Sequence, residues 1–311
     1  MGLTAHLGSR LKILLLGRDG QVGWELQRSL AQLGAVIALS RADADLEKSE
    51  TLREIIRQHA PHLIVNAAAY TAVDKAESEP ELAMIVNCHA VQVLAEEAQK
   101  LSALLIHYST DYVFDGRKAV PYTEDDAPNP LGVYGRTKLD GECAIQATGC
   151  KYLIFRTSWV YAARGGNFAK TILRLAQERD KLNVVVDQVG APTSAELIAD
   201  VTALCVGSIM HCPERFAHAD GIYHLVASGE TSWHNYARFV VDNAAQLGLP
   251  LKLTSDSIRS ITTSEYPLPA KRPANSRLAT AKLSRVFGIE PPHWHTHLKR
   301  VLEELVLGEK G

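Results

Sequence analysis

Three glycines at three-residue spacing follow directly on a short apolar run near the start of this chain. The apolar run spans Leu11 to Leu16, the glycines are Gly17, Gly20 and Gly23, and residues 24–33 have helical spacing. Glycine permits a sharp turn, close approach of the backbone to a phosphate, and tight packing of the helix on the strand. A strand, a glycine turn and a helix in this order predict a nucleotide-binding unit, with the pyrophosphate at the helix amino terminus.

Further apolar runs alternate with segments of helical spacing, at residues 36–39, 63–65, 104–106 and 152–155. This alternation predicts an α/β fold, a Rossmann-type doubly wound parallel sheet with helices on both faces. Sites in such sheets lie at the carboxyl ends of the strands. Polar or glycine segments follow four of the runs, at residues 17, 66–69, 109–111 and 156–159. We therefore expect these four segments to meet at one edge of the sheet.

The chain of 311 residues is long enough for a nucleotide domain and a smaller substrate domain. We expect residues 11–160 to form mainly the NAD(P)-binding domain. Residues 161–307 are expected to form mainly the substrate-binding part, interwoven with the first, and residues 1–10 a disordered extension. Within these parts, helices are expected at residues 134–147, 194–210, 232–247 and 295–307.

Composition excludes several classes of function. The net charge is −2 with no long basic run, so nucleic acid and anionic membranes are not expected partners. Neither an apolar stretch of membrane-spanning length nor a signal-peptide core is present, which favours a cytoplasmic protein. The five cysteines show no zinc-type or redox spacing, so we expect reduced, structural thiols.

Tyr134 and Lys138 are the strongest candidates for chemistry. On a helix, a spacing of four places both side chains on one face. A tyrosine has a pKa of about 10, so proton donation near neutral pH benefits from a neighbouring cation that stabilises the phenolate. A hydroxyl from Ser109 or Thr110 would complete an acid site. The pair also fits an ordinary solvated helix face, and only its context favours catalysis.

The residues after the second apolar run bear on cofactor choice. NAD-selective sites usually have an acidic residue there for the ribose 2′-hydroxyl. This chain has Ser40 and then Arg41, a small group beside a cation that could meet the 2′-phosphate of NADPH. Asp43 or Asp45 could still contact the ribose or adenine, so NADH remains possible.

Longer motifs carry a resemblance to a known family. The GxxGxxG spacing is typical of the extended branch of the short-chain dehydrogenase/reductase superfamily. Five segments resemble the dTDP-4-dehydrorhamnose reductase family within that branch, and the resemblance runs from about Leu11 to Leu305; the segments are residues 66–77, 108–114, 156–161, 187–193 and 272–278. Its members reduce the 4-keto group of dTDP-4-dehydro-L-rhamnose, the last step in making the dTDP-L-rhamnose used for polymers such as lipopolysaccharide O antigen.

The resemblance implies a role for each matching position. Tyr134 would protonate the sugar oxygen, Lys138 would bind the cofactor ribose and lower the pKa of Tyr134, and Thr110 would hydrogen-bond the same oxygen. The cofactor positions would be Gly17, Gly20, Gln21, Val22, Gly23, Ser40, Arg41, Asp45, Leu46, Ala69, Tyr70, Thr71, Tyr108, Tyr134 and Lys138. The substrate positions would be Thr110, Asp111, Trp159, Arg272, Asn275 and Ser276.

The resemblance also implies a divalent ion, Mg²⁺, at a subunit contact of a homodimer. The matching carboxylates are Glu25, Glu196 and Glu304. Two alternatives to the reductase remain open. One is another extended short-chain enzyme, a nucleotide-sugar epimerase or dehydratase with tightly held NAD. The other is a non-catalytic NADP-binding protein like the regulatory subunit of methionine adenosyltransferase.

Overall fold

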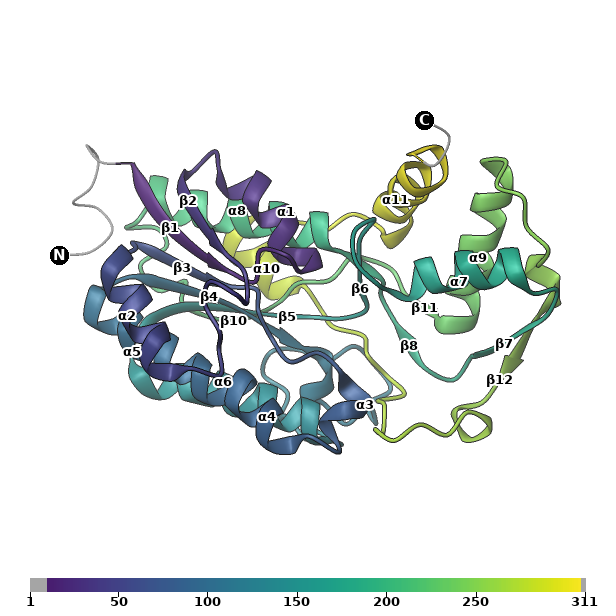
Figure 1. Cartoon of the computed structure of the whole chain (residues 1–311), viewed down its shortest axis with the longest axis horizontal. Helices are drawn as coiled ribbons and strands as arrows, with labels where there is room; N and C mark the ends of the chain where they lie inside the picture. Colours follow the sequence, from purple (N-terminus) through teal and green to yellow (C-terminus); the bar gives the residue numbers. More distant parts are fainter. Residues whose placement is uncertain (1–9, 309–311) are drawn as a thin grey trace.

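A computed structural model describes residues 10–308, so all but the last residue of the expected 1–10 extension lies outside the described part. A six-stranded sheet with the order β10-β5-β4-β3-β1-β2 forms its larger lobe (Figure 1). The strands are β1 (Leu11–Leu16), β2 (Gly34–Leu39), β3 (Leu63–Asn66), β4 (Leu104–Thr110), β5 (Lys151–Thr157) and β10 (Gly221–His224). Every pairing in this sheet is parallel, which confirms the predicted α/β fold.

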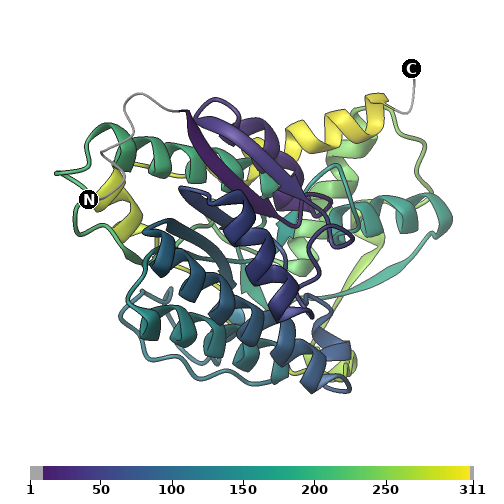
Figure 2. The ribbon, with the colours of Figure 1, turned by 60° about the vertical axis from the view of Figure 1, so that its left-hand side comes forward.

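Helices cover both faces of the sheet, because its strands are apolar on both sides (Figures 1 and 2). Ile13 and Leu15 of β1 pack toward α1 (Gln21–Leu30) and α8 (Ala195–His211). Leu14 and Leu16 pack toward the opposite face. That face is covered by α2 (Ser49–His59), α5 (Ala90–Leu101) and α6 (Val133–Thr148).

The smaller lobe is built mostly from the second half of the chain. It contains α7 (Phe168–Glu178), α9 (Trp233–Gln246) and the parallel pair β7 (Leu182–Val185) and β12 (Ile258–Ile261). Short pairs join β6 (Val160–Tyr161) to β9 (Thr193–Ser194) and β8 (Val189–Gly190) to β11 (Thr231–Ser232). The last helices are α10 (Ala281–Phe287) and α11 (Trp294–Gly308).

Short helical turns complete the fold between these elements. They are α3 (Val73–Ala76), α4 (Pro80–Met84), the π-helix η2 (Ile85–His89) and the 3₁₀ turns η3 (Asp111–Val113), η4 (Ser255–Ser257) and η5 (Thr263–Glu265).

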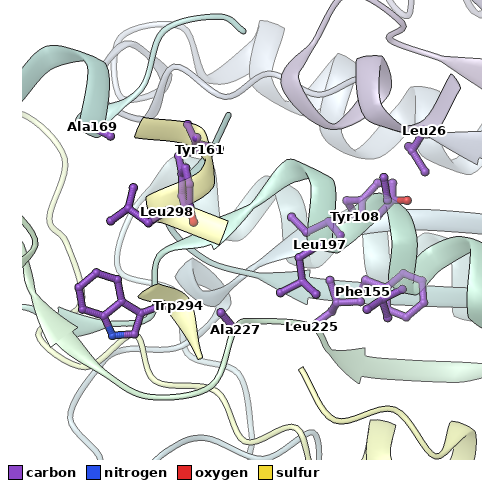
Figure 3. Packing of buried hydrophobic residues seen from close by; sticks show 14 of the residues in the cluster. Leu26, Tyr108, Phe155, Tyr161, Ala169, Leu197, Leu225, Ala227, Trp294 and Leu298 are labelled. Carbon is purple, nitrogen blue, oxygen red and sulfur yellow. The ribbon is translucent and has the colours of Figure 1, made fainter. Parts of the chain in front are cut away.

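The chain crosses repeatedly between the lobes. After α7 and β7 in the smaller lobe, the chain returns to the larger lobe as α8 and β10, and α9 lies in the smaller lobe again. The Tyr122 amide donates to the carbonyl of Arg277 at 2.8 Å. One continuous hydrophobic cluster links the lobes, from Tyr108 and Phe155 at the sheet to Trp294 and Leu298 of α11 (Figure 3). No helix among residues 10–308 is both long and apolar enough to cross a membrane.

One helix and one strand depart most from the sequence-based prediction. Helix α1 begins at Gln21 and ends at Leu30, three residues earlier at each end than expected. The extended backbone of Gly20 precedes it, and the Trp24 amide donates to the Gly20 carbonyl, which sets the first turn. Strand β10 was not predicted, because its four residues are too short to stand out from the following apolar residues. The five cysteines are free, as expected.

Candidate active site

The glycine turn brings the β1–α1 connection against β3. Gly17 has φ +82°, and a Cβ there would lie 2.7 Å from the amide nitrogen of Ala68. A Cβ on Gly23 would lie 2.0 Å from the Gly17 carbonyl oxygen, so α1 packs on the turn only because that residue is glycine. The amides of residues 21–23 lie ahead of the first hydrogen bond within the helix. Such amides form an anion site at a helix amino terminus.

Gln21 connects this turn to the smaller lobe. Its side-chain oxygen accepts a hydrogen bond of 2.9 Å from Asn167, whose own oxygen caps α7 by accepting from the Lys170 amide. The neighbouring Val22 packs against the large hydrophobic cluster. The turn therefore lies between the two lobes.

The surroundings of Ser40 and Arg41 at the end of β2 differ from the prediction that these two residues meet the 2′-phosphate of NADPH. The amide and hydroxyl of Ser40 both donate to Asp43, at 2.9 and 2.7 Å, which holds that carboxylate at the strand end and lowers its pKa. Arg41 is 79% exposed and faces Glu47 and Asp45.

Arg18, in the glycine turn, reaches the same place. Its guanidinium donates to the Ala38 carbonyl and lies 3.7 Å from the Asp43 carboxylate. Sequence reasoning missed Arg18, although its position within the glycine motif was visible.

The remaining predicted cofactor residues have mixed surroundings. Residues 69–71 follow β3, and Asn87 pins the Tyr70 backbone by bonding both its amide and its carbonyl. Leu46 is buried in the core beside α2, while Asp45 is partly exposed. The Tyr108 side chain points into the core, with its hydroxyl 2.8 Å from that of Thr202. The backbone carbonyl of Tyr108 instead accepts from Lys138, so its role toward the cofactor stays a prediction.

Helix α6 lies unusually close to the segment after β4. A Cβ on Gly135 would lie 2.1 Å from the Tyr112 carbonyl oxygen, and one on Gly141 would lie 2.2 Å from the Asn87 carbonyl oxygen. These glycines let α6 approach until the rings of Tyr134 and Tyr112 meet edge to face, with centroids 5.5 Å apart. The helix thereby carries both predicted catalytic residues to the end of β4.

Tyr134 lies beside Thr110, as predicted. Burial raises the pKa of Tyr134 to about 12, the Thr110 hydroxyl opposes that rise, and Asp111 adds to it. The Thr110 hydroxyl also donates to Asp111 and accepts from the Tyr112 amide, both at 3.1 Å. The expected lowering of the Tyr134 pKa by Lys138 stays a prediction.

Lys138 is 1% exposed and points toward the end of β4. Its Nζ donates to the Tyr108 carbonyl at 2.7 Å and lies 3.1 Å from Nε2 of His107. Burial lowers the pKa of Lys138 to about 8, although Glu142 opposes the shift. Glu142 is held by two hydrogen bonds from Arg156, at 3.0 and 2.6 Å. A lysine with this pKa can exchange a proton near neutral pH.

Asp111 lies behind Thr110 and is fully enclosed. Burial raises the pKa of Asp111 to about 6, while the hydroxyls of Ser276 and Thr110 lower it. Among the described residues, its Oδ2 has no hydrogen-bond partner. A buried carboxylate oxygen without a partner is costly, so it is a natural place for a ligand hydroxyl. Both Asp111 and Ser276 were predicted to contact substrate.

Trp159 is held in a strained backbone conformation next to a second tryptophan. Its φ is +49°, and its ring stacks on Trp233 with centroids 3.6 Å apart. A Cβ on Gly190 would lie 2.8 Å from the Trp159 ring. Non-glycine residues with such φ values gather at functional sites. The sequence indicated Trp159 but gave no sign of Trp233 as its partner.

Two of the predicted diphosphate ligands have partners within the chain. The Arg272 guanidinium makes a two-pronged contact with Asp74, at 3.1 and 2.8 Å. Asn275 donates to the carbonyls of Lys118 and Val120, and its oxygen accepts twice from Arg277. The side chain of Asn275 is therefore used in holding the loop, while Arg272 could exchange Asp74 for a phosphate.

A cavity of about 460 Å³ opens beside Arg272 in the smaller lobe. It lies between α7, β7, β12 and residues 266–272, and its walls are mainly apolar. Trp233 and Phe168 supply aromatic surface, and Gln188 and Thr263 supply polar groups.

The three candidate metal ligands influence one another across three helices. Burial raises the pKa of Glu25, and Glu196 and Glu304 add to the rise. Glu25 pairs with Arg28 at 3.5 Å, and Glu196 pairs with Arg300 at 3.0 Å. Within residues 10–308, no group of three or more His, Cys, Asp or Glu side chains is arranged to hold a metal ion. The residues of one chain thus do not fit the magnesium ion, and its place at a subunit contact stays a prediction.

Comparisons with known proteins cover almost the whole chain. Residues 11–307 match the family described as the RmlD substrate binding domain. The dTDP-4-dehydrorhamnose reductase of Salmonella typhimurium is 52% identical over 299 residues, covering 95% of this chain and 98% of that protein. Crystal structures of the reductases from Clostridium acetobutylicum and from Bacillus anthracis, the latter in complex with NADP, have TM-scores of 0.85 and 0.84 at 34% and 30% identity. Each covers 95% of this chain and 99% of the other.

Proposed function

The chain belongs to the dTDP-4-dehydrorhamnose reductase family of oxidoreductases, and we propose that it reduces the 4-keto group of dTDP-4-dehydro-L-rhamnose with NADPH. The arrangement of Tyr134, Thr110 and the glycine turn at one edge of the parallel sheet carries this proposal. It supports a site where a proton donor meets a sugar oxygen beside a bound nicotinamide. The product would enter dTDP-rhamnose biosynthesis.

The chain's own residues provide orientation and the proton. When bound, the cofactor supplies a hydride. Thr110 and Tyr134 would hold the keto oxygen, and Tyr134 would donate its proton to that oxygen as charge develops there. Asp111, whose Oδ2 has no partner within residues 10–308, would accept a hydrogen bond from a sugar hydroxyl. The part of the Trp159 ring that Trp233 leaves open would pack against the apolar face of the deoxysugar.

The cofactor fits the glycine turn because residues 21–23 offer free amides and because side chains larger than glycine would clash there. For the 2′-phosphate of NADPH, we propose Arg18 as the main partner, with Arg41 assisting. Arg18 is bound to the strand end through the Ala38 carbonyl, whereas Arg41 is exposed. Asp43, held by Ser40, would accept a hydrogen bond from the 2′-hydroxyl of NADH. We therefore expect the protein to use both cofactors and to prefer NADPH.

Binding of fragments tests this assignment without turnover. Calorimetry with adenosine 2′,5′-bisphosphate and with ADP should show that Arg18→Ala weakens only the bisphosphate, by about tenfold or more, as expected for loss of a charged hydrogen bond. Arg41→Ala should have a smaller effect. Equal losses for both fragments, or a larger effect from Arg41, would reject the assignment.

The cavity beside Arg272 supports a place for the thymidine part of the substrate. Its aromatic walls suit a nucleobase, and Gln188 and Thr263 can meet the polar edges of the base. Arg272 would leave Asp74 and bind the diphosphate with its planar fork. The sugar would then extend past Trp159 toward Tyr134. The homodimer, the magnesium ion and the cytoplasmic location remain proposals, and no catalytic step depends on them.

The decisive test is oxidation of NADPH by purified protein with dTDP-4-dehydro-L-rhamnose, followed by absorbance of the reduced nicotinamide. Tyr134→Phe should abolish turnover, because phenylalanine has no proton to donate, while NADPH affinity should change little. No oxidation by the wild-type chain, with NADPH shown to bind, would reject the reductase. If the protein copurifies with NAD and turns over without added cofactor, the result would instead support the alternative function as an epimerase.

A further inference from the structure

Lys138 contacts a buried histidine to which the mechanism above gives no role. Nε2 of His107 lies 3.1 Å from Lys138 Nζ, and its Nδ1 lies 3.2 Å from the side-chain nitrogen of Asn66, on the neighbouring strand. Asn66, His107 and Lys138 are each 1% exposed. Their polar atoms therefore depend on one another for hydrogen bonds.

The backbone fixes the direction of these hydrogen bonds. The Ala68 amide donates to the side-chain oxygen of Asn66 at 3.1 Å, so the NH₂ group of Asn66 faces His107. An NH₂ group only donates, and Nδ1 of His107 must therefore accept. Burial holds the pKa of His107 well below its usual value, so the ring is neutral. Its single proton then belongs on Nε2.

The Nε2 proton of His107 points at Lys138. An ammonium group has three donors and no acceptor, so it opposes this N–H. A neutral amine accepts it through the nitrogen lone pair and can still donate to the Tyr108 carbonyl. The hydrogen-bond chain from Ala68 through Asn66 and His107 thus favours the neutral form of Lys138.

We infer that His107 is a positioning residue whose Nε2 proton stabilises neutral Lys138, so that Lys138 returns a proton to Tyr134 after each reduction. This role rests on the proposed reductase mechanism. An N–H bond of the Lys138 ammonium breaks and the O–H bond of Tyr134 re-forms, so the ammonium and phenolate charges cancel. A proton from water then restores the ammonium before the next reduction. Any hydroxyl between the two side chains relays by giving up one proton as it receives another.

Other charged groups facing Lys138 leave this role intact. Glu142 on α6 raises the pKa of Lys138, but its charge is offset by the paired Arg156 on β5. Tyr134 on α6 is neutral near pH 7, since its pKa is raised to about 12. His107 on β4 is therefore the neighbour that acts specifically on the neutral amine.

Nuclear magnetic resonance of the wild-type protein tests directly which ring nitrogen of His107 carries the proton. With nitrogen-isotope-labelled histidine, the His107 ring should show a protonated Nε2 and a bare Nδ1 at neutral pH. Loss of the signal in His107→Gln assigns it. A proton on Nδ1 would overturn the inference. This readout needs no turnover, so it stands apart from any failure of the proposed function.

Three variants test the consequence through the pH dependence of kcat, whose basic limb reports loss of the Lys138 proton. Glutamine at position 107 can accept from Asn66 and donate to Lys138, so His107→Gln should keep the limb of the wild type. His107→Leu removes the hydrogen-bond donor to Lys138. Asn66→Asp reverses the direction of the hydrogen bonds, because a carboxylate at position 66 accepts from Nδ1 of His107. Both should move the limb upward by about half to one pH unit, as expected for one lost hydrogen bond.

His62→Gln is the matched control. His62 lies beside the amino end of β3, away from the site, where Nδ1 accepts from the Lys12 amide at 3.0 Å. It should leave the limb unchanged. If His107→Gln moves the limb as far as His107→Leu, or if neither moves it, His107 has only a structural role. The resonance measurement decides the question if His107→Leu fails to fold.

Discussion

Gly135→Ala should push helix α6 away from the segment that follows β4. The added Cβ would lie 2.1 Å from the Tyr112 carbonyl oxygen, and real Cβ atoms essentially never come closer than 3.0 Å. The Tyr112 carbonyl is backbone, so α6 and this segment must open by about 0.9 Å. Tyr134 would then move away from Thr110 by a similar amount. Misplacement by about 1 Å can cost about 100-fold in rate, and overpacking costs about 1–3 kcal/mol of stability.

Steady-state kinetics and thermal unfolding check this prediction together. We expect kcat to fall by about 100-fold, because Tyr134 is displaced from Thr110. Gly207→Ala is the matched control, since Gly207 also lies within a helix and its Cβ would meet nothing closer than 3.6 Å. That variant should gain about 0.5–1 kcal/mol from helix propensity and keep full activity. Wild-type kcat in Gly135→Ala would refute the close-approach argument.

Three further predictions concern acid stability, the buried aspartate and the nucleotide. Arg57, Lys100 and Arg53 lower the pKa of Glu97 to about 2 from 4.5. A carboxylate with a lowered pKa stabilises the fold above pH 4.5, and this effect is lost as the pH falls toward 2. In urea unfolding, Glu97→Gln should therefore lower the free energy of unfolding by at most about 3 kcal/mol at pH 7, and by little near pH 2. Burial raises the pKa of Asp111 from 3.8 to about 6, so a penalty on folding grows as the pH rises above 3.8 and is complete above 6. Asp111→Asn should therefore unfold at higher temperature than wild type at pH 7.5 yet turn over more slowly, and an unchanged melting temperature would contradict this. Arg272→Ala should weaken dTDP by about tenfold but thymidine hardly at all in calorimetry, and equal losses would exclude contact with the diphosphate.

Local patterns were sufficient to predict five of the six strands of the sheet, all but β10, and the convergence of the catalytic residues. Apolar runs identify buried strands, and parallel strands place Gly17, Thr110 and residue 157 at one edge. Helix α6 is the next long helix after β4, and Tyr134 lies at its amino-terminal end, so Tyr134 returns to that edge. The alternation of side chains between the two sides of β4 would also have predicted which of them face α6. Successive strand side chains face opposite sides, so His107 and Ser109 point toward α6 while Tyr108 points toward α8.

Contacts between distant segments could not be predicted in this way. Arg272 and Asp74 are 198 positions apart, and neither neighbourhood indicates the other. The use of Asn275 to hold the loop at 118–120 depends on the same long-range crossing. Both arise where the smaller lobe folds back on the larger one, which no periodicity reports.

Two positions of β4 explain why the catalytic helix is held so firmly. His107 contacts Lys138, and Ser109 donates to Glu142, one helical turn further along α6. Glu142 and Arg156 are buried and paired, so loss of either partner would leave an uncompensated charge and cost several kcal/mol. The odd-numbered side chains of β4 therefore fix α6 by polar contacts, while glycines allow its close approach. Because the same contacts set the protonation of Lys138, the rigidity of the helix and the acid chemistry of the site have a common structural origin.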